Sequence, residues 1–492
     1  MRSSGILLHI SSLPSAGGIG TLGEEACRFV DFLQNSGTGI WQVLPIGPVG
    51  LGGSPYQSPS AFAGNPLLID LEQLRQEGLL QVDEAQNCMA SHEEPIDFAL
   101  LTQKRLAALK LAWRRAEARF AVEMARFSAE NPWLEDYALY CALTDHFGGR
   151  PWTEWKDEAI RRREPQALQR YAAELEETVR FHRFVQFVFF RQWYALKEYA
   201  NNRGVRIFGD IPIYTAMESA DTWAHPDIFQ LDECLQPTAI AGVPPDYFSA
   251  DGQVWENPLY DWKRIKTTGY AWWTQRMREM AKRYDIVRID HFIGLVRYYA
   301  IPAGAAAARS GRYYRGPGRS LLRVLEQQVP GLNIVAEDLG VALPAVKKLL
   351  NEFGYPGMRV LEFAFGSDKD NMHLPHNIGP NTVLYTGTHD NDTVLGWWRK
   401  AEEWERRFAA EYLGATDEAQ ICRTMIEAVF ASNADTAIIP MQDFLELGSE
   451  ARMNTPGTVG GNWVWRMQSG QLTGDLCDTI RALNQKYKRK TG

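Results

Sequence analysis

The sequence predicts an α/β fold: a (β/α)8, or TIM, barrel with inserted, largely helical subdomains and no C-terminal β domain. Two observations lead to this prediction. Short apolar, β-rich runs recur eight times along the 492 residues, and most of them are followed by an amphipathic helical pattern. Strands that alternate with helices form βαβ units and a parallel sheet. Eight such units close into a barrel, whose functional residues gather at the carboxyl ends of the strands.

The expected strands follow the apolar runs in order, and they lie at 6–10, 40–46, 205–213, 286–292, 333–339, 358–365, 382–389 and 436–441. Amphipathic patterns between them predict helices, for example at 24–34, 274–283, 343–351 and 417–431. After the last run roughly 50 residues remain, which is too short for a separate β-sandwich domain.

Two connections are much longer than a barrel requires. They are 47–203, between strands 2 and 3, and 214–284, between strands 3 and 4. Within the first, 101–127 and 166–200 read as long helices, and Pro165 suits a helix start because its missing N–H needs no partner there. Structureless loops of this length are implausible. We therefore expect a single catalytic barrel spanning 1–492 with two inserted subdomains.

The composition excludes several classes of protein. Lys and Arg number 52 against 60 Asp and Glu, a net charge of −8, which argues against a nucleic-acid partner. The six cysteines are scattered without metal-like spacing, as expected for reduced thiols in the cytoplasm. No signal-peptide pattern and no membrane-spanning apolar stretch is present. The 12% aromatic content suits either large cores or sugar stacking.

Acidic residues stand at the ends of three expected strands. Arg288 and Asp290 are two apart in one run, so they share a face, and the arginine favours an ionised carboxylate. A structural ion pair is the alternative. Glu337 and Asp338 end the next run, and since successive residues face opposite ways, only one of them can enter the barrel mouth. Asp390 lies in a polar cluster that could also be a turn, a helix cap or a metal site.

Three acids at strands 4, 5 and 7 are hard to explain by capping. Retaining glycoside chemistry needs one ionised carboxylate to attack the anomeric carbon and a protonated partner to donate to the leaving oxygen. A third acid can bind sugar hydroxyls in the transition state. On this interpretation Asp290 is the nucleophile, Glu337 the acid/base and Asp390 the stabiliser.

The chain resembles glycoside hydrolase family 77, the 4-α-glucanotransferases of the amylomaltase or disproportionating type, in the α-amylase clan. The resemblance covers nearly the whole chain. It rests on LHISSLPS, WQVLPIGP at 41–48, SPYQSPSAFAGNP at 54–66, FGDIPIY at 208–214, PPDYFSADGQVWENPLY at 244–260, VRIDHF, AEDLG, TGTHDNDT and RMNTPGT at 452–458.

This resemblance implies the same three catalytic roles and a transfer reaction. Segments of maltooligosaccharides or of starch- or glycogen-derived α-1,4-glucans would pass to the 4-hydroxyl of another glucan or of glucose, with no metal or organic cofactor. Family positions for substrate contact fall on Tyr56, Asp210, Arg288, His291 and His389. The segment 244–260 would be a loop over the cleft, with contacts from Tyr247, Phe248, Gln253 and Trp255. Glu256 departs from the family, which more often has glycine there.

Other interpretations were weighed. An α-1,4-glucan hydrolase would use the same acids, and a non-catalytic glucan-binding protein would lack one of them. The GxGxxG match at 18–23 lacks the acid that dinucleotide binding needs after the next strand. His373 and His376 are interpreted as loop residues rather than metal ligands, and 486–490 as a solvated basic tail. The sequence leaves the oligomeric state open.

Overall fold

A closed parallel barrel of eight strands forms the centre of the molecule. The computed structural model describes residues 2–88, 95–245, 251–305, 307–340, 343–458 and 460–489. Neighbouring barrel strands follow the order β1-β12-β11-β10-β9-β6-β3-β2. The strands are β1 (Ser3–Leu7), β2 (Ile40–Gln42), β3 (Arg206–Ile211), β6 (Ile286–Ile289), β9 (Asn333–Ala336), β10 (Gly357–Val360), β11 (Thr382–Tyr385) and β12 (Thr436–Pro440). The predicted barrel is confirmed.

Most expected strands run past their observed ends. The run 286–292 ends as a strand at Ile289, and 382–389 ends at Tyr385. Beyond these points the chain turns into the barrel mouth, where apolar residues such as Phe292 are still buried. Because apolar content persists through the turn, hydrophobicity alone does not mark where the strand stops.

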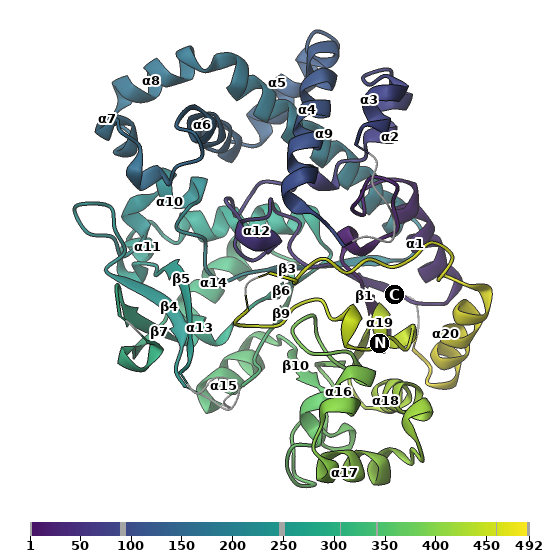
Figure 1. Cartoon of the computed structure of the whole chain (residues 1–492). Coiled ribbons are helices and arrows are strands. Elements are labelled where there is room, and N and C mark those ends of the chain that lie inside the picture. The colour runs from purple at the N-terminus through teal and green to yellow at the C-terminus, as the bar shows by residue number, and fades with distance from the viewer. Residues whose placement is uncertain are drawn as a thin grey trace.

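Helices cover the outside of the barrel. Those expected between strands appear as α1 (Glu24–Asn35), α12 (Ala271–Arg283), α15 (Pro344–Phe353) and α18 (Glu418–Ala431). Further outer helices are α14 (Arg319–Gln328), α16 (Val394–Lys400), α17 (Glu403–Leu413) and α20 (Gly474–Lys486). In Figure 1, α16, α17 and α18 form the lower lobe of the view.

A helical layer lies between β2 and β3 in the chain, and it occupies the top of Figure 1. It contains α2 (Leu71–Gln76), α3 (Val82–Gln86), α4 (Phe98–Ala116), α5 (Ala121–Glu130), α6 (Trp133–His146), α7 (Glu158–Arg161), α8 (Pro165–Glu174) and α9 (Glu176–Asn201). Each of the two expected long helices is in fact two helices. The second breaks at Leu175, whose φ of −104° and ψ of 18° lie outside the helical range. Pro165 is the first residue of α8.

A second, antiparallel sheet stands beside the barrel, in the order β5-β4-β7-β8. Its strands are β4 (Ala239–Val243), β5 (Gln253–Pro258), β7 (Arg297–Pro302) and β8 (Arg312–Arg315). The sequence analysis missed this sheet and expected the insertions to be largely helical. The runs RYYAIP and RYYR interleave Tyr with Arg and therefore lack the apolar signal of a buried strand. The sheet is at the left of Figure 1.

The barrel closes between its first and last strands. Ser3 to Leu7 of β1 pair in parallel with Thr436 to Pro440 of β12. The end of the described chain strengthens this seam, because buried Arg489 donates hydrogen bonds to the carbonyl oxygens of Ser3 and Ala434. The expectation that 486–490 form a solvated tail is therefore wrong for Arg489. Its guanidinium takes the place of water at carbonyls beyond the sheet.

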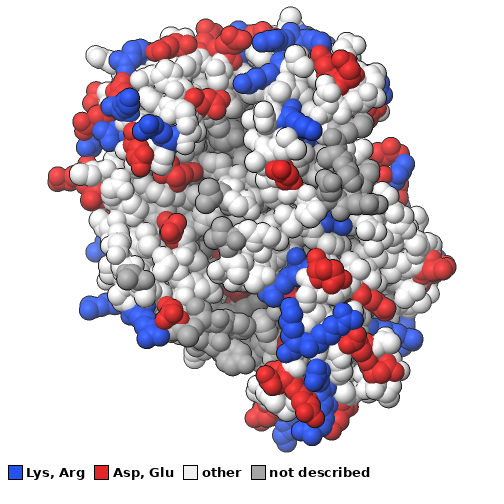
Figure 2. Space-filling model, viewed as in Figure 1, with Lys and Arg blue, Asp and Glu red and all other residues white. Residues whose placement is uncertain are grey.

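Charges of both signs are interspersed around the margins of the face in Figure 2, and few lie near its middle. Among the described residues, no helix is both long and apolar enough to span a bilayer.

Candidate active site

Two of the three predicted acids follow neighbouring barrel strands directly. Asp290 comes after β6 and donates its backbone N–H to Ile211 O at 2.9 Å. Glu337 comes after β9 and donates its N–H to Ile289 O at 3.1 Å. These bonds continue the barrel ladder by one residue, so both acids sit on rigid backbone at the carboxyl end of the barrel, where the catalytic residues of such barrels lie.

Arg288 links two carboxylates beneath the mouth. Its Nη1 donates to both oxygens of Asp210 at 2.8 and 2.6 Å, and its Nη2 lies 2.8 Å from Asp290 Oδ1. Tyr56 donates its hydroxyl to Asp210 Oδ2 at 2.7 Å. Asp210 and Arg288 are almost completely buried, whereas 28% of the Asp290 side chain is exposed. Asp290 is therefore held from below and open from above.

Burial raises the pKa of Asp290 to about 6, the Arg288 charge opposes that rise, and the negative charges of Asp210 and Asp390 add to it. At neutral pH the carboxylate is mostly ionised. It is thus a charged group with one oxygen bound to Arg288 and the side chain accessible from the barrel mouth, which suits a nucleophile.

Glu337 accepts two backbone hydrogen bonds. His291 N–H donates to its Oε2 at 2.9 Å, and Leu339 N–H donates to its Oε1 at 2.8 Å. Burial nevertheless raises the pKa of Glu337 to about 8, with Arg288 opposing and the Asp290 charge adding to the rise. Glu337 is therefore mostly protonated at neutral pH, as a proton donor must be.

Asp338, the neighbour of Glu337, faces away from the mouth. It accepts from Met358 N–H at 2.8 Å and pairs with Arg359 at 3.1 Å, both on β10. The alternation of side chains is as expected, but the helix-capping role considered for Asp338 is wrong, since α15 begins after Leu343.

Asp390 lies in the turn after β11 and is held by the segment near the end of the chain. Asn454 Nδ2 donates to its Oδ1 at 2.6 Å, and His389 Nε2 lies 3.3 Å from its Oδ2. Arg452 donates to the Asp390 carbonyl oxygen at 2.6 Å. Asn454 and Arg452 belong to the RMNTPGT stretch, which the sequence analysis quoted without giving it a role in the site.

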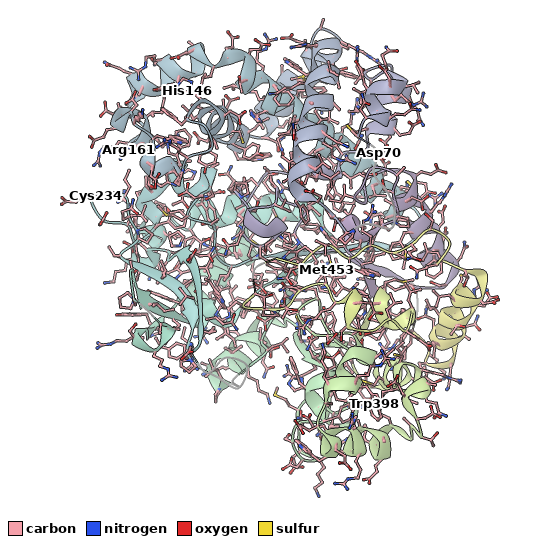
Figure 3. All side chains as sticks on the ribbon, in the orientation of Figure 1. Asp70, His146, Arg161, Cys234, Trp398 and Met453 are labelled. Atoms are coloured by element: carbon pink, nitrogen blue, oxygen red, sulfur yellow. The ribbon has the colours of Figure 1, made fainter. Side chains whose placement is uncertain are left out.

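Aromatic rings pack beside Asp390. Tyr56 stacks on His389 with centroids 5.2 Å apart, and Trp463 lies 5.7 Å from Tyr56 and 5.9 Å from His389. Met453, whose carbonyl oxygen accepts from Trp463 N–H, is near the centre of the view in Figure 3, where this late segment crosses the barrel. Sequence reasoning missed Trp463, because its partners are distant in the chain.

His291 meets the predicted loop. Its ring stands edge-on to Trp255 at 4.8 Å, and Trp255 Nε1 donates to Gln253 Oε1 at 3.1 Å. Burial lowers the pKa of His291 to about 4, so the ring is neutral at working pH. The structure thus brings Gln253 and Trp255 to the site, while Tyr247 and Phe248 lie outside the described residues.

Glu256 has a φ of +62°, in the left-handed region that favours glycine. The departure noted in the sequence therefore falls where the backbone itself prefers glycine. The loop holds this conformation while Gln57 Nε2 donates to the carbonyl oxygen of neighbouring Trp255 at 3.2 Å.

The other motifs have structural explanations. A Cβ on Gly20 would stand 1.8 Å from Ile10 O, so this glycine permits a close backbone approach. His373 Nδ1 accepts from Val360 N–H at 3.1 Å, and His376 Nδ1 lies 2.8 Å from Tyr412 Oη. Among the described residues, no cluster of three or more His, Cys, Asp or Glu is arranged to hold a metal ion.

Comparison with known proteins gives one consistent family. The family model described as 4-alpha-glucanotransferase matches residues 8–473. The chain is 44% identical to a 4-alpha-glucanotransferase of Streptococcus pneumoniae, covering 99% of this chain and 97% of the relative. It is 45% identical to that of Thermus thermophilus, with 99% of each chain covered. The solved amylomaltase of Streptococcus agalactiae, a complex with acarbose, is 40% identical, with full coverage of both chains and a TM-score of 0.97.

Proposed function

The chain belongs to the 4-alpha-glucanotransferase family, glycoside hydrolase family 77, and from this membership we propose how its site carries out the transfer. Asp290 is the nucleophile, Glu337 the acid/base and Asp390 the transition-state stabiliser. The observation that carries the proposal is the opposite protonation of two acids on adjacent strands, with pKa values of about 6 for Asp290 and about 8 for Glu337. Environments that separate two carboxyl pKa values in this way assign the acid and the base.

The reaction has two balanced steps. Asp290 attacks the anomeric carbon of an α-1,4-linked glucan, the C1–O4 bond breaks, and Glu337 gives its proton to the departing 4-oxygen. The donor segment is then covalently bound to Asp290. In the second step the 4-hydroxyl of an acceptor loses its proton to Glu337 and attacks C1, which releases Asp290. Both charges return to their starting state.

We propose that maltooligosaccharides and starch- or glycogen-derived glucans are donors and that glucose also serves as acceptor. Tyr56, Asp210, Arg288, His291 and His389 lie around the three acids and would contact the sugar bound there. Trp255 and Gln253 would border the acceptor. We further propose that 47–203 and 214–284 are inserted subdomains of a single catalytic barrel.

A cytoplasmic location is also part of the proposal. It is supported by the six cysteines, all of which are free. Thiols persist in this state in a reducing compartment.

Incubation with maltotriose alone tests the function. A transferase produces longer oligomers together with glucose, whereas a hydrolase only shortens its substrate. Asp290→Asn and Glu337→Gln should each lose most of the transfer. Asp338→Asn is the matched control, since this adjacent acid is bound to β10 and should retain transfer. Substantial activity in either of the first two variants would contradict the assigned roles.

A further inference from the structure

A buried carboxyl, Glu362, lies behind the turn that carries Asp390. It belongs to the short 3-10 helix Leu361–Ala364 that follows β10, and it is 6% exposed. Its backbone N–H donates to Thr386 O at 3.1 Å, which joins the end of strand 6 to the end of strand 7. Neither the catalytic chemistry nor the sequence motifs account for an acid at this position.

The side chain of Glu362 reaches the turn itself. It makes a hydrogen-bonding contact with Asn391, and a Cβ on Gly387 would stand 2.6 Å from its Oε1. Asn391 Oδ1 in turn accepts from the backbone N–H of Thr388 at 3.0 Å and from the Thr388 hydroxyl at 2.9 Å. The Asp390 N–H donates to that hydroxyl at 3.3 Å. A continuous chain of contacts therefore runs from Glu362 to the backbone of Asp390.

The charges around Glu362 oppose its ionisation. Burial raises its pKa well above the ordinary value, and the negative charges of Asp443 and Asp392 raise it further, while Arg452 and the Asn391 contact oppose the rise. Asp443 is already committed to Thr386 Oγ1 and Val394 N–H at 2.6 and 2.8 Å.

The nearby cations have other partners. Lys400 Nζ lies 2.6 Å from Asp392 Oδ2, and Arg452 donates to backbone oxygens. Glu362 Oε1 has no hydrogen-bond partner in the described structure. A carboxylate would thus be a third buried anion here without a cation of its own, whereas a neutral carboxylic acid avoids that cost.

We propose that Glu362 is a positioning residue that works as a neutral carboxylic acid, holding the Thr388–Asn391 turn so that Asp390 faces the reacting sugar. The proposal rests on the role proposed for Asp390. It also adds a requirement that the catalytic chemistry does not contain: one acid of the strand-end cluster must keep its proton while Asp290 loses its own.

Three variants test the positioning. Glu362→Gln keeps the shape and the neutral charge, so its kcat for transfer should stay within threefold of wild type. Glu362→Ala removes the contact with Asn391 and should lower kcat by about tenfold or more, with KM changed less than threefold. Asn391→Ala should give a similar loss. The double alanine variant should lose little more than either alone, since both interrupt the same chain of contacts.

A thermal measurement tests the protonation without any activity. If the folded state holds a proton on Glu362 that the unfolded state releases above its ordinary pKa of about 4.5, wild-type stability must decline with rising pH. Glu362→Gln removes that dependence. Its Tm should therefore exceed that of wild type by an amount that increases from pH 5 to pH 8.

Glu279→Gln is the matched control, because Glu279 is equally buried and also has an unpartnered oxygen, but it pairs with Lys282 at 2.7 Å. It should show no such increase. Loss of kcat in Glu362→Gln, or a Tm below wild type at pH 8, would overturn the proposal. Full activity of Asp390→Asn would instead refute the role of Asp390, and the pH-dependent Tm gain would remain, so the two failures can be told apart.

Discussion

The pH dependence of kcat/KM follows from two groups of the site. Asp290 must be ionised to attack, and its pKa is about 6; Glu337 must be protonated to donate, and its pKa is about 8. The profile should therefore be a bell centred near pH 7. At pH 5 about one tenth of the enzyme has an ionised Asp290, and at pH 9 about one tenth has a protonated Glu337, so kcat/KM should fall roughly tenfold on either side.

A single substitution separates the two limbs. Glu337→Gln removes the titrating acid, and an α-maltosyl fluoride donor removes the need for one, since fluoride leaves without a proton. Because Glu337 is neutral near pH 6, a neutral amide in its place should leave the pKa of Asp290 almost unchanged. The acid limb should then persist near pH 6 while the alkaline limb disappears.

Fluoride release at low donor concentration, measured from pH 4.5 to 9.5, reports kcat/KM for the first step. Wild-type enzyme with maltotriose and with the fluoride provides the two reference profiles. An alkaline limb that survives in Glu337→Gln would assign that limb to another group and refute the reasoning. An acid limb near pH 4 would show that burial does not raise the pKa of Asp290.

Three further outcomes are expected. Trp255→Ala should raise the ratio of glucose release by hydrolysis to transfer, since the ring beside His291 would no longer exclude water; an unchanged product ratio would contradict this. Glu256→Gly should be more stable than Glu256→Ala by about 1 kcal/mol in denaturant unfolding, because both lose the carboxylate and only glycine relieves the positive φ. Asn454→Ala should lower kcat about tenfold through loss of its charge-assisted bond to Asp390, whereas equal kcat values would mean that this bond does not position the acid.

The acids were within reach of sequence reasoning for a local reason. Asp290 and Glu337 directly follow apolar runs, so a strand pattern places them at the barrel mouth without knowledge of any distant contact. The eight strands could be predicted on the same basis, since each is a buried run between turn residues. Strand ends were less certain, because burial continues into the turns.

What the pattern could not reveal depends on contacts between distant segments. Asn454 is 64 residues from Asp390, and nothing near either residue indicates the bond between them. Glu362 reads as an ordinary polar residue after a strand, and only the packing of Gly387 and Asn391 against it shows that it is enclosed. The break at Leu175 likewise reflects how α8 and α9 pack, since the local sequence favours a continuous helix.

The seam between β1 and β12 affects how the protein can be made. Ser3 pairs with Thr436, so the first barrel strand lacks one neighbour until residues more than 430 positions later have been synthesised. At about 5–20 residues per second, that wait is roughly 20 to 90 s. During this time β2 can pair with β1, but the opposite edge of β1, with five residues that are all buried in the finished barrel, stays open. The nascent chain must keep a buried strand from pairing elsewhere until its last partner arrives.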